Sequence, residues 1–233
     1  MKKLGIIGAM TIEVEAIKAQ MKQMREIQKA GMTFYEGLLE QMPVVLVVCG
    51  VGKVNAAMCV QAMCDLFNVT HIVNTGVAGS LDADLDIGDF VVSTKAIYHD
   101  FDCRSLGYSI GQVPGLTAQF FPADEELINL AYEAAQNVHQ DHVRKGIVAS
   151  GDQFVSAGVQ KDKIIHDTGA MCTEMEGAAI AHCAWRNNIP FVVIRAISDK
   201  ADDSAQMDYP AFEAIAAKRS AKVTQILAMK LAK

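Results

Sequence analysis

A chain of 233 residues, 51% of them hydrophobic, is long enough to bury one sizeable core, and we expect a single domain over residues 1–233. The formal net charge of -6 and the lack of any Lys/Arg cluster exclude the basic patch that nucleic acids and anionic membranes require. Neither is therefore an expected partner.

The first apolar run, Leu4 to Gly8, is predicted to be a buried strand. The apolar stretch that contains it stops at Thr11 and Glu13, before the apolar region of a secretion signal would be complete. No later run approaches the ~20 apolar residues needed to span a bilayer. A cytoplasmic location is expected.

Strand and helix patterns alternate along the rest of the chain. Further apolar runs predicted as strands are Val44 to Cys49, His71 to Thr75, Phe90 to Ser93, Val143 to Ser150, Ala170 to Thr173 and Phe191 to Ile197. Helical patterns cover Ile12 to Met24, Lys53 to Phe67, Asp124 to His139, Glu176 to Asn187 and Tyr209 to Leu231. Because near-continuous hydrophobicity is typical of parallel strands covered on both faces, the predicted fold class is α/β.

Two segments depart from this alternation. From Met32 to Leu39 the side chains alternate in polarity with the two-residue period of a strand, and Pro43 follows. This pattern predicts an antiparallel hairpin and hence a mixed, mostly parallel sheet. His99 to Pro122 carries glycine, proline and aromatic residues without a regular period, which is typical of a functional loop or a subunit contact. Its apolar side chains Phe101, Leu106, Tyr108 and Val113 predict a homodimer.

The cysteines and histidines indicate neither redox nor metal chemistry. Cys49, Cys59, Cys64, Cys103, Cys172 and Cys183 form no C-x-x-C pair, and several lie in apolar patterns, as buried free thiols do. The six histidines show neither H-E-x-x-H nor another dense ligand spacing, so no metal site is predicted.

The junctions after the predicted strands carry most of the polar motifs, and ligands of open α/β sheets bind at such strand ends. The motifs are Gly8-Ala9-Met10 with Glu13, Cys49-Gly50-Val51-Gly52-Lys53, Asn74-Thr75-Gly76-Val77-Ala78-Gly79-Ser80, Ser150-Gly151-Asp152-Gln153-Phe154, Glu174-Met175-Glu176 and Arg195-Ala196-Ile197-Ser198-Asp199.

These glycines match neither phosphate-binding motif. Val47 and Val54 break a P-loop, and Asn55 breaks a dinucleotide fingerprint. The glycines at positions 50, 52, 76 and 79 therefore either let something small or flat approach the backbone or form tight turns, and tight turns are favoured.

Four carboxylates, Glu13, Glu174, Glu176 and Asp199, should converge on one cleft at these strand ends. Singly, Glu13 could be a first-turn helix acid, Asp199 a loop cap, and one of Glu174 and Glu176 a helix cap. Together, with Arg195 after an apolar stretch, they favour a functional cluster. Such a cleft suits hydrolysis of a glycosidic bond, in which an acid protonates the leaving group, a base activates water and no cofactor is needed.

The same motifs, in collinear order from residue 4 to about residue 230, resemble those of bacterial 5'-methylthioadenosine/S-adenosylhomocysteine nucleosidases, in the nucleoside phosphorylase superfamily. The resemblance implies a dimeric three-layer α/β sandwich that holds a nucleoside at its strand ends. It implies that Asp199, supported by Ser198, protonates adenine, and that Glu13, with Arg195, positions and deprotonates the attacking water.

The resemblance also implies a set of substrate-binding residues. Glu176, beside Met175, would bind the ribose hydroxyls, and Phe154 and Val155 would hold adenine. The sugar and thioalkyl pocket would be lined by Met10, Val51 and Tyr209, with Leu106 reaching in from the partner subunit, and Val77, Ala78, Gly79 and Glu174 complete the substrate-binding set.

Some positions depart from the family pattern. Thr11-Ile12 stands where many members carry two acidic residues, Val77 replaces a frequent serine, and Leu106 and Tyr209 replace frequent phenylalanines. These changes bear on the preference between methylthio and homocysteinyl substrates and leave the carboxylates untouched.

Two alternatives are weighed against this hypothesis. A phosphorylase of the same superfamily is disfavoured because no arginine stands at the Gly50 or Gly76 junction, and a carboxylate such as Glu13 about 4 Å from a phosphate would cost roughly 4 kcal/mol. A non-catalytic nucleoside sensor or storage protein is disfavoured because it needs no proton donor beside adenine.

Overall fold

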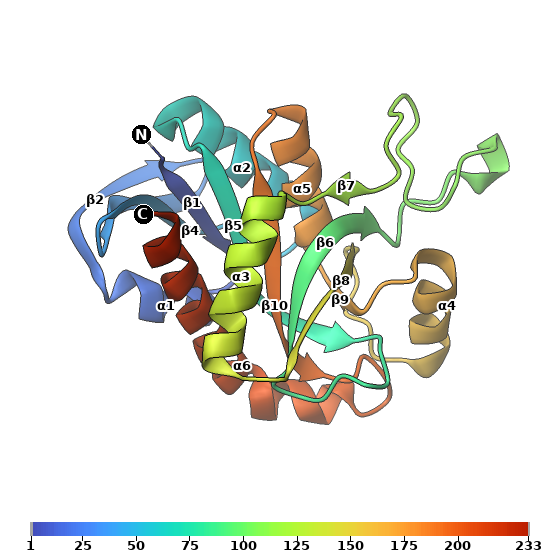
Figure 1. The fold of residues 1–233 in the computed structure, drawn as a ribbon. Coiled ribbons are helices and arrows are strands. Elements are labelled where there is room, and N and C mark those ends of the chain that lie inside the picture. The colour runs from blue at the N-terminus through green and yellow to red at the C-terminus, as the bar shows by residue number, and fades with distance from the viewer. Residues whose placement is uncertain (1, 233) are drawn as a thin grey trace.

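The computed structural model describes residues 2–232, apart from the side chains of residues 206 and 207. Its elements are β1 (Leu4–Gly8), α1 (Thr11–Lys18), β2 (Met21–Lys29), β3 (Met32–Leu39), β4 (Met42–Val48), α2 (Lys53–Phe67), β5 (His71–Ser80), β6 (Phe90–Tyr98), η1 (Arg104–Leu106), β7 (Phe121–Pro122), α3 (Glu125–Val138), β8 (Val143–Ser150), α4 (Gly158–Thr168), β9 (Cys172–Glu174), α5 (Gly177–Arg186), β10 (Phe191–Asp199) and α6 (Ala205–Leu231). Figure 1 shows their arrangement.

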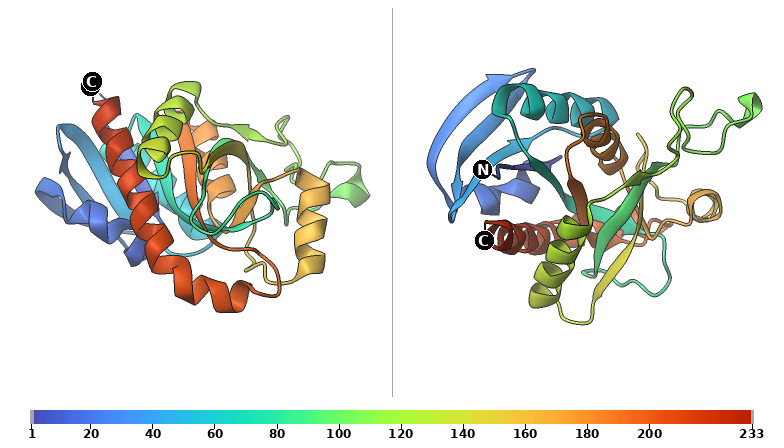
Figure 2. Two further views of the ribbon diagram at one scale, coloured as in Figure 1. Left: turned by 60° about the horizontal axis from the view of Figure 1, so that its bottom comes forward. Right: turned by 45° about the horizontal axis from the view of Figure 1, so that its top comes forward.

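All these strands join one mixed sheet, and helices cover both of its faces (Figures 1 and 2). Residues of α2 and α5 pack in one buried core, whereas residues of α1, α3 and α6 pack in the other. Alternate residues of the central strand β1 contribute to the two cores: Ile7 packs in the first, and Leu4 and Ile6 pack in the second. The predicted mixed α/β sandwich is confirmed.

Part of the sheet closes on itself. Strand β10 pairs in parallel with β5 and antiparallel with β6, and the chain of pairings continues from β6 through β8 and β9 back to β5. The pairing of β10 with β5 sets Arg195 opposite Gly76 and Asp199 opposite Gly79. Two of the polar junctions identified in the sequence therefore lie side by side.

Several predicted boundaries were wrong. The helix predicted over Ile12 to Met24 ends at Lys18, and Met21 to Met24 belong to the edge strand β2, whose two methionines at a three-residue spacing imitate a helical stripe. Strands β5 and β6 extend beyond the predicted Thr75 and Ser93. The mostly polar helix α4 was not predicted at all.

The segment from His99 to Pro122 is largely loop, as predicted, and includes the short turn η1 and strand β7. In Figures 1 and 2 this loop projects from the body of the molecule. Within residues 2–232, no helix combines the length and the apolar character that a membrane span requires.

Candidate active site

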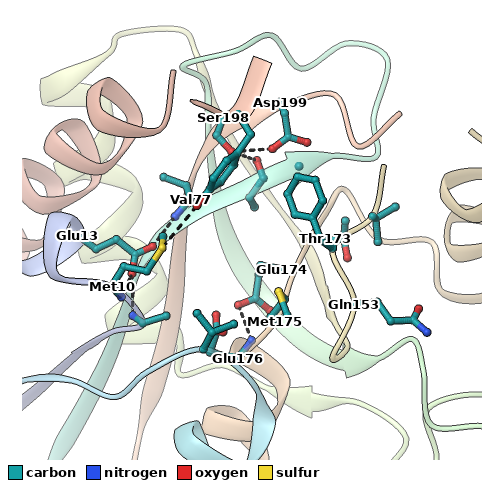
Figure 3. Close-up of a pocket in the computed structure, with 17 residues that line it drawn as sticks. Met10, Glu13, Val77, Gln153, Thr173, Glu174, Met175, Glu176, Ser198 and Asp199 are labelled. Atoms are coloured by element: carbon teal, nitrogen blue, oxygen red, sulfur yellow. Dashed lines mark hydrogen bonds between the residues drawn. The ribbon is translucent and has the colours of Figure 1, made fainter. Parts of the chain in front are cut away.

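The carboxyl ends of β1, β5, β9 and β10 and the start of α5 surround a pocket with an empty volume of about 580 Å³, counted out to the solvent (Figure 3). Concave sites at the carboxyl ends of strands are where open α/β sheets bind small molecules. Of the site residues predicted from the sequence, Met10, Glu13, Val51, Val77, Ala78, Gly79, Phe154, Val155, Glu174, Met175, Glu176, Ser198, Asp199 and Tyr209 line it. Arg195 and Leu106 do not.

Glu13 is a buried carboxylate in the first turn of α1. Its Oε2 accepts hydrogen bonds from the backbone N–H groups of Ala9 and Met10, at 2.7 and 2.9 Å, so it fixes the start of the helix. Its Oε1 accepts only a longer bond, 3.2 Å, from the Val77 N–H. Burial raises the pKa of Glu13, against the opposing charge of Arg195, so this oxygen can take up a proton more readily than that of an ordinary glutamate.

Arg195 lies behind the pocket, where its Nη2 donates to Asn74 Oδ1 and to Glu174 Oε2. Glu174 also accepts from the Ser150 hydroxyl and from the Gly177 N–H. Burial alone would raise the pKa of Glu174, but the charge of Arg195 and these hydrogen bonds hold it below its usual value. Glu174 is therefore an ionised, fully engaged carboxylate that fixes the start of α5.

Glu176 has a different environment, although only Met175 separates it from Glu174. Its Oε1 accepts a 2.8 Å hydrogen bond from the Gly52 N–H, and the side chain lines the pocket. Burial and the nearby charge of Glu174 raise its pKa. Helix capping therefore explains Glu174, whereas Glu176 keeps an oxygen for a ligand.

Asp199 closes the opposite side of the pocket and is 2% exposed. Its Oδ1 accepts from the Ala201 N–H at 2.9 Å, and its Oδ2 lies 2.8 Å from the Ser198 hydroxyl. Burial raises its pKa. The Ser198 hydroxyl is also 3.3 Å from the Ala78 carbonyl, so it can donate to ionised Asp199 or turn to Ala78 and accept from protonated Asp199.

The four junction glycines serve two purposes. Gly50 and Gly52 have φ of +85° and +98°, a backbone conformation that favours glycine, where the chain passes from β4 to α2. Gly76 and Gly79 do not, and the tight-turn prediction was wrong for them. A Cβ at Gly76 would lie 2.5 Å from Glu13 Oε1, and one at Gly79 would lie 2.7 Å from Asp199 Oδ1. The lack of a side chain at Gly76 and Gly79 therefore leaves room for the carboxylates of Glu13 and Asp199.

The mouth of the pocket is aromatic. The rings of Phe154 and Tyr209 meet edge to face with centroids 5.5 Å apart. The Tyr209 hydroxyl donates to Glu213 Oε1 at 2.8 Å and lies 3.5 Å from the Met10 sulfur. Leu106 is far more exposed, at 72%, and lies on the loop that projects from the body.

Comparison with known proteins identifies the family of the chain. The phosphorylase superfamily model matches residues 3–228. The 5'-methylthioadenosine/S-adenosylhomocysteine nucleosidase of Halalkalibacterium halodurans is 41% identical over 96% of both chains. The chain belongs to this nucleosidase family of the phosphorylase superfamily.

Solved structures agree with this membership. The nucleosidase of the same name from Neisseria meningitidis, in complex with methylthio-immucillin-A, has a TM-score of 0.95 and 35% identity, covering 99% of this chain and 100% of that one. The futalosine hydrolase of Helicobacter pylori strain 26695 has a TM-score of 0.93 and 33% identity, covering 98% of both chains.

The nucleosidase-like pocket also contains residues that the site prediction missed. Ala9, Gln153 and Thr173 line it, and the buried Thr173 hydroxyl has no hydrogen-bond partner within residues 2–232. Ala9 and Gln153 stand within the polar motifs and Thr173 directly precedes Glu174, so position in the motifs was the available signal. Asn74 and Ser150, which hold Arg195 and Glu174, were quoted within motifs but given no role.

Proposed function

We propose that this nucleosidase-family protein hydrolyses the N-glycosidic bond of 5'-methylthioadenosine and S-adenosylhomocysteine, releasing adenine and a thioribose. The observation that carries the proposal is a pair of buried carboxylates with raised pKa values, Glu13 and Asp199, that line one pocket of a chain in this family. One can act as the base for water and the other as the acid for the leaving group, so the reaction needs no cofactor.

Asp199 is the proposed general acid. Adenine leaves poorly as an anion, so its ring must gain a proton as the bond to ribose breaks. The raised pKa of Asp199 keeps a larger fraction protonated near neutral pH. Ser198 accommodates both states, because its hydroxyl lies within reach of Asp199 and of the Ala78 carbonyl. Deprotonation of Asp199 therefore leaves no polar group unpaired.

Glu13 is the proposed base. Its Oε2 is fixed by two backbone N–H groups, so Oε1 is the oxygen left to receive a proton from water. Arg195 reaches the reaction indirectly, because its guanidinium is bound to Asn74 and Glu174 and acts on Glu13 through charge. We assign Arg195 a positioning role.

We assign the remaining pocket residues to contacts with different parts of the substrate. Glu176, with one oxygen held by Gly52, would accept hydrogen bonds from the ribose hydroxyls beside Met175. The ring of Phe154 would stack on adenine while the backbone at Val155 reads its edge. Met10, Val51 and Tyr209 would contact the 5'-thio substituent, as would Val77, where a serine is frequent.

A homodimer would complete this pocket. Leu106 projects with the long loop, and Val51, Val54 and Met58 expose an apolar stripe that continues from the pocket along α2. Burying this stripe and Leu106 against a second copy would remove apolar surface that a monomer leaves in water. We also propose the cytoplasmic location predicted from the sequence.

Water rather than phosphate is the proposed nucleophile, because the pocket is lined by the carboxylate of Glu13, and the charge of Arg195 is already neutralised by Glu174. The test is to incubate the protein with methylthioadenosine in phosphate-free buffer and to identify adenine and the sugar by chromatography. Free 5-thioribose sugar is expected. A sugar 1-phosphate formed only when phosphate is added would assign a phosphorylase, and absence of turnover on this substrate, on S-adenosylhomocysteine and on futalosine would overturn the nucleosidase proposal.

A further inference from the structure

Two histidines and one carboxylate meet at a corner of the fold outside the pocket. Asp89 precedes β6, His139 follows α3, and His142 precedes β8. One ligand atom from each of the three lies within 4.8 Å of the others. The His139 and His142 rings stack with their centroids 4.3 Å apart.

The Asp89 carboxylate is held ready for a ligand. Its Oδ2 accepts a 2.9 Å hydrogen bond from the Asp86 N–H, which fixes the orientation of the group. Among the described residues, the hydrogen bond to its Oδ1 comes from His142 Nδ1 alone, at 2.9 Å. Metal-binding carboxylates are commonly oriented by such a second hydrogen bond.

His139 and His142 supply nitrogen donors on the solvent side of Asp89. His139 Nδ1 lies 3.3 Å from the Gly88 carbonyl, and such a bond to one ring nitrogen would leave the other for a metal. The side chain of His142 is 51% exposed, so an ion could enter from solvent and keep water as a further ligand. Neutral imidazole and carboxylate are ligands of Zn²⁺ and related divalent transition metals.

We propose that Asp89, His139 and His142 form a binding site for a divalent transition-metal ion of the Zn²⁺ class, with water completing the coordination. Two ligand atoms bound about 2 Å from one zinc ion lie roughly 3 to 4 Å apart, so the observed separations require only modest side-chain rotation. The ion would replace the hydrogen bond between Asp89 and His142.

The corner is attached to the strand that carries Asp199. The Ile197 N–H donates to the Asp89 carbonyl at 2.9 Å, and the Gly88 N–H donates to the Ile197 carbonyl at 2.8 Å. An ion on Asp89 would therefore join β6, the end of α3 and the start of β8 to β10, and it should stabilise the folded chain.

Little in the sequence indicates this site, and no metal was predicted from it. His139 and His142 are three residues apart, but Asp89 lies about 50 positions earlier and reaches them only because β6 and β8 pair side by side, with Phe90 opposite Val143.

The test is titration of the metal-free chain with Zn²⁺ by calorimetry, and with Co²⁺ by its visible absorption. Wild-type protein should bind one ion per chain, and Zn²⁺ should raise its unfolding temperature. His139→Gln and His142→Gln should each weaken binding more than about tenfold, as loss of a ligand costs at least what loss of its supporting partner does. Both histidines are partly exposed, so the variants should fold, which circular dichroism checks.

His166→Gln is the matched control, because His166 is an exposed histidine whose Nδ1 lies 3.1 Å from Asp167 Oδ1 but which has no second histidine beside it among the described residues. It should bind the ion like wild type. Binding that survives both site substitutions would assign the ion to the free cysteines, and equal weakening by His166→Gln would assign it to scattered surface histidines. Either result, or no binding, overturns the proposal.

Discussion

At the level of single residues, Asp199 carries the most demanding step of the proposed reaction. Asp199→Asn keeps the shape of the side chain but cannot deliver a proton. Turnover of methylthioadenosine should fall at least ~100-fold, since general acids typically contribute ~10²–10⁴-fold. Nucleoside binding should weaken far less. Single-turnover rates and equilibrium binding separate the two effects, and near wild-type turnover would mean that the proton comes from elsewhere.

The pH dependence of activity follows from the same two carboxylates. Glu13 must be ionised and Asp199 protonated, and burial raises both pKa values. The value of kcat/KM should therefore fall at acid pH as Glu13 gains its proton and at alkaline pH as Asp199 loses its own. In Asp199→Asn the alkaline fall should vanish while the acid fall persists. An unchanged alkaline limb in that variant would assign it to another group.

Glu176 should decide between ribose and deoxyribose. Its free oxygen can accept hydrogen bonds from a sugar diol, so 2'-deoxy analogues should be poor substrates for the wild-type protein. Glu176→Gln should lose rate on ribosides and with it most of the preference for them. The ratio of kcat/KM values for the two sugars is the measurement. A wild-type ratio near one would remove Glu176 from this role.

At the level of elements, the junction between β9 and α5 contains two glutamates, Glu174 and Glu176, with opposite effects on stability. The pKa of Glu174 is lowered on folding, so its contribution is present at neutral pH and is lost as pH falls through its folded pKa. The pKa of Glu176 is raised to about 8, so at neutral pH the folded chain holds this side chain mostly protonated whereas the unfolded chain ionises it, which costs stability.

Glu174→Gln should therefore destabilise the fold at pH 7, because it leaves the buried Arg195 without its counter-charge. Breaking such a pair typically costs about 3–5 kcal/mol. In a chain of this size that lowers the unfolding temperature by on the order of 10 °C. Glu176→Gln, the matched control two residues away, should leave the unfolding temperature unchanged or raise it. Equal loss in both variants would contradict the assigned protonation states.

The elements differ in how far the sequence predicts them. Helix α2 was predicted over its observed range, Lys53–Phe67, because its apolar period is long and Gly52 precedes it. Helix α4 was missed because it buries only Ile164 and Thr168 and so lacks an apolar stripe. The pocket was foreseen because its residues follow strands, whereas the ring formed by β5, β10, β6, β8 and β9 depends on pairings between distant segments.

At the level of the whole molecule, the proposed dimer depends on Leu106 and the α2 stripe. Replacing both Leu106 and Val54 with Asp should give a monomer, because burying two unpaired charges opposes association. Light scattering measures the mass, and activity should fall with it, since Leu106 is proposed to complete the partner's pocket. Lys230→Asp, on an exposed ion pair with Glu133, is a surface control. A fully active monomer would overturn the proposed role of the dimer.

Strand β5 also has a consequence for the range of leaving groups. Gly76 lies beneath Glu13 and Gly79 beneath Asp199, and three residues of extended chain span about 10 Å. The separation of the two carboxylates is thus constrained by the rise of one strand in the interior. A pyrimidine nucleoside lacks the imidazole ring whose second nitrogen a purine offers to Asp199, so Glu13 and Asp199 cannot act on its sugar and its base at the same time. The backbone of β5 would then determine the selection of purine over pyrimidine nucleosides. Substitutions of side chains at the mouth of the pocket would change which 5' substituents are accepted but would not admit pyrimidine nucleosides.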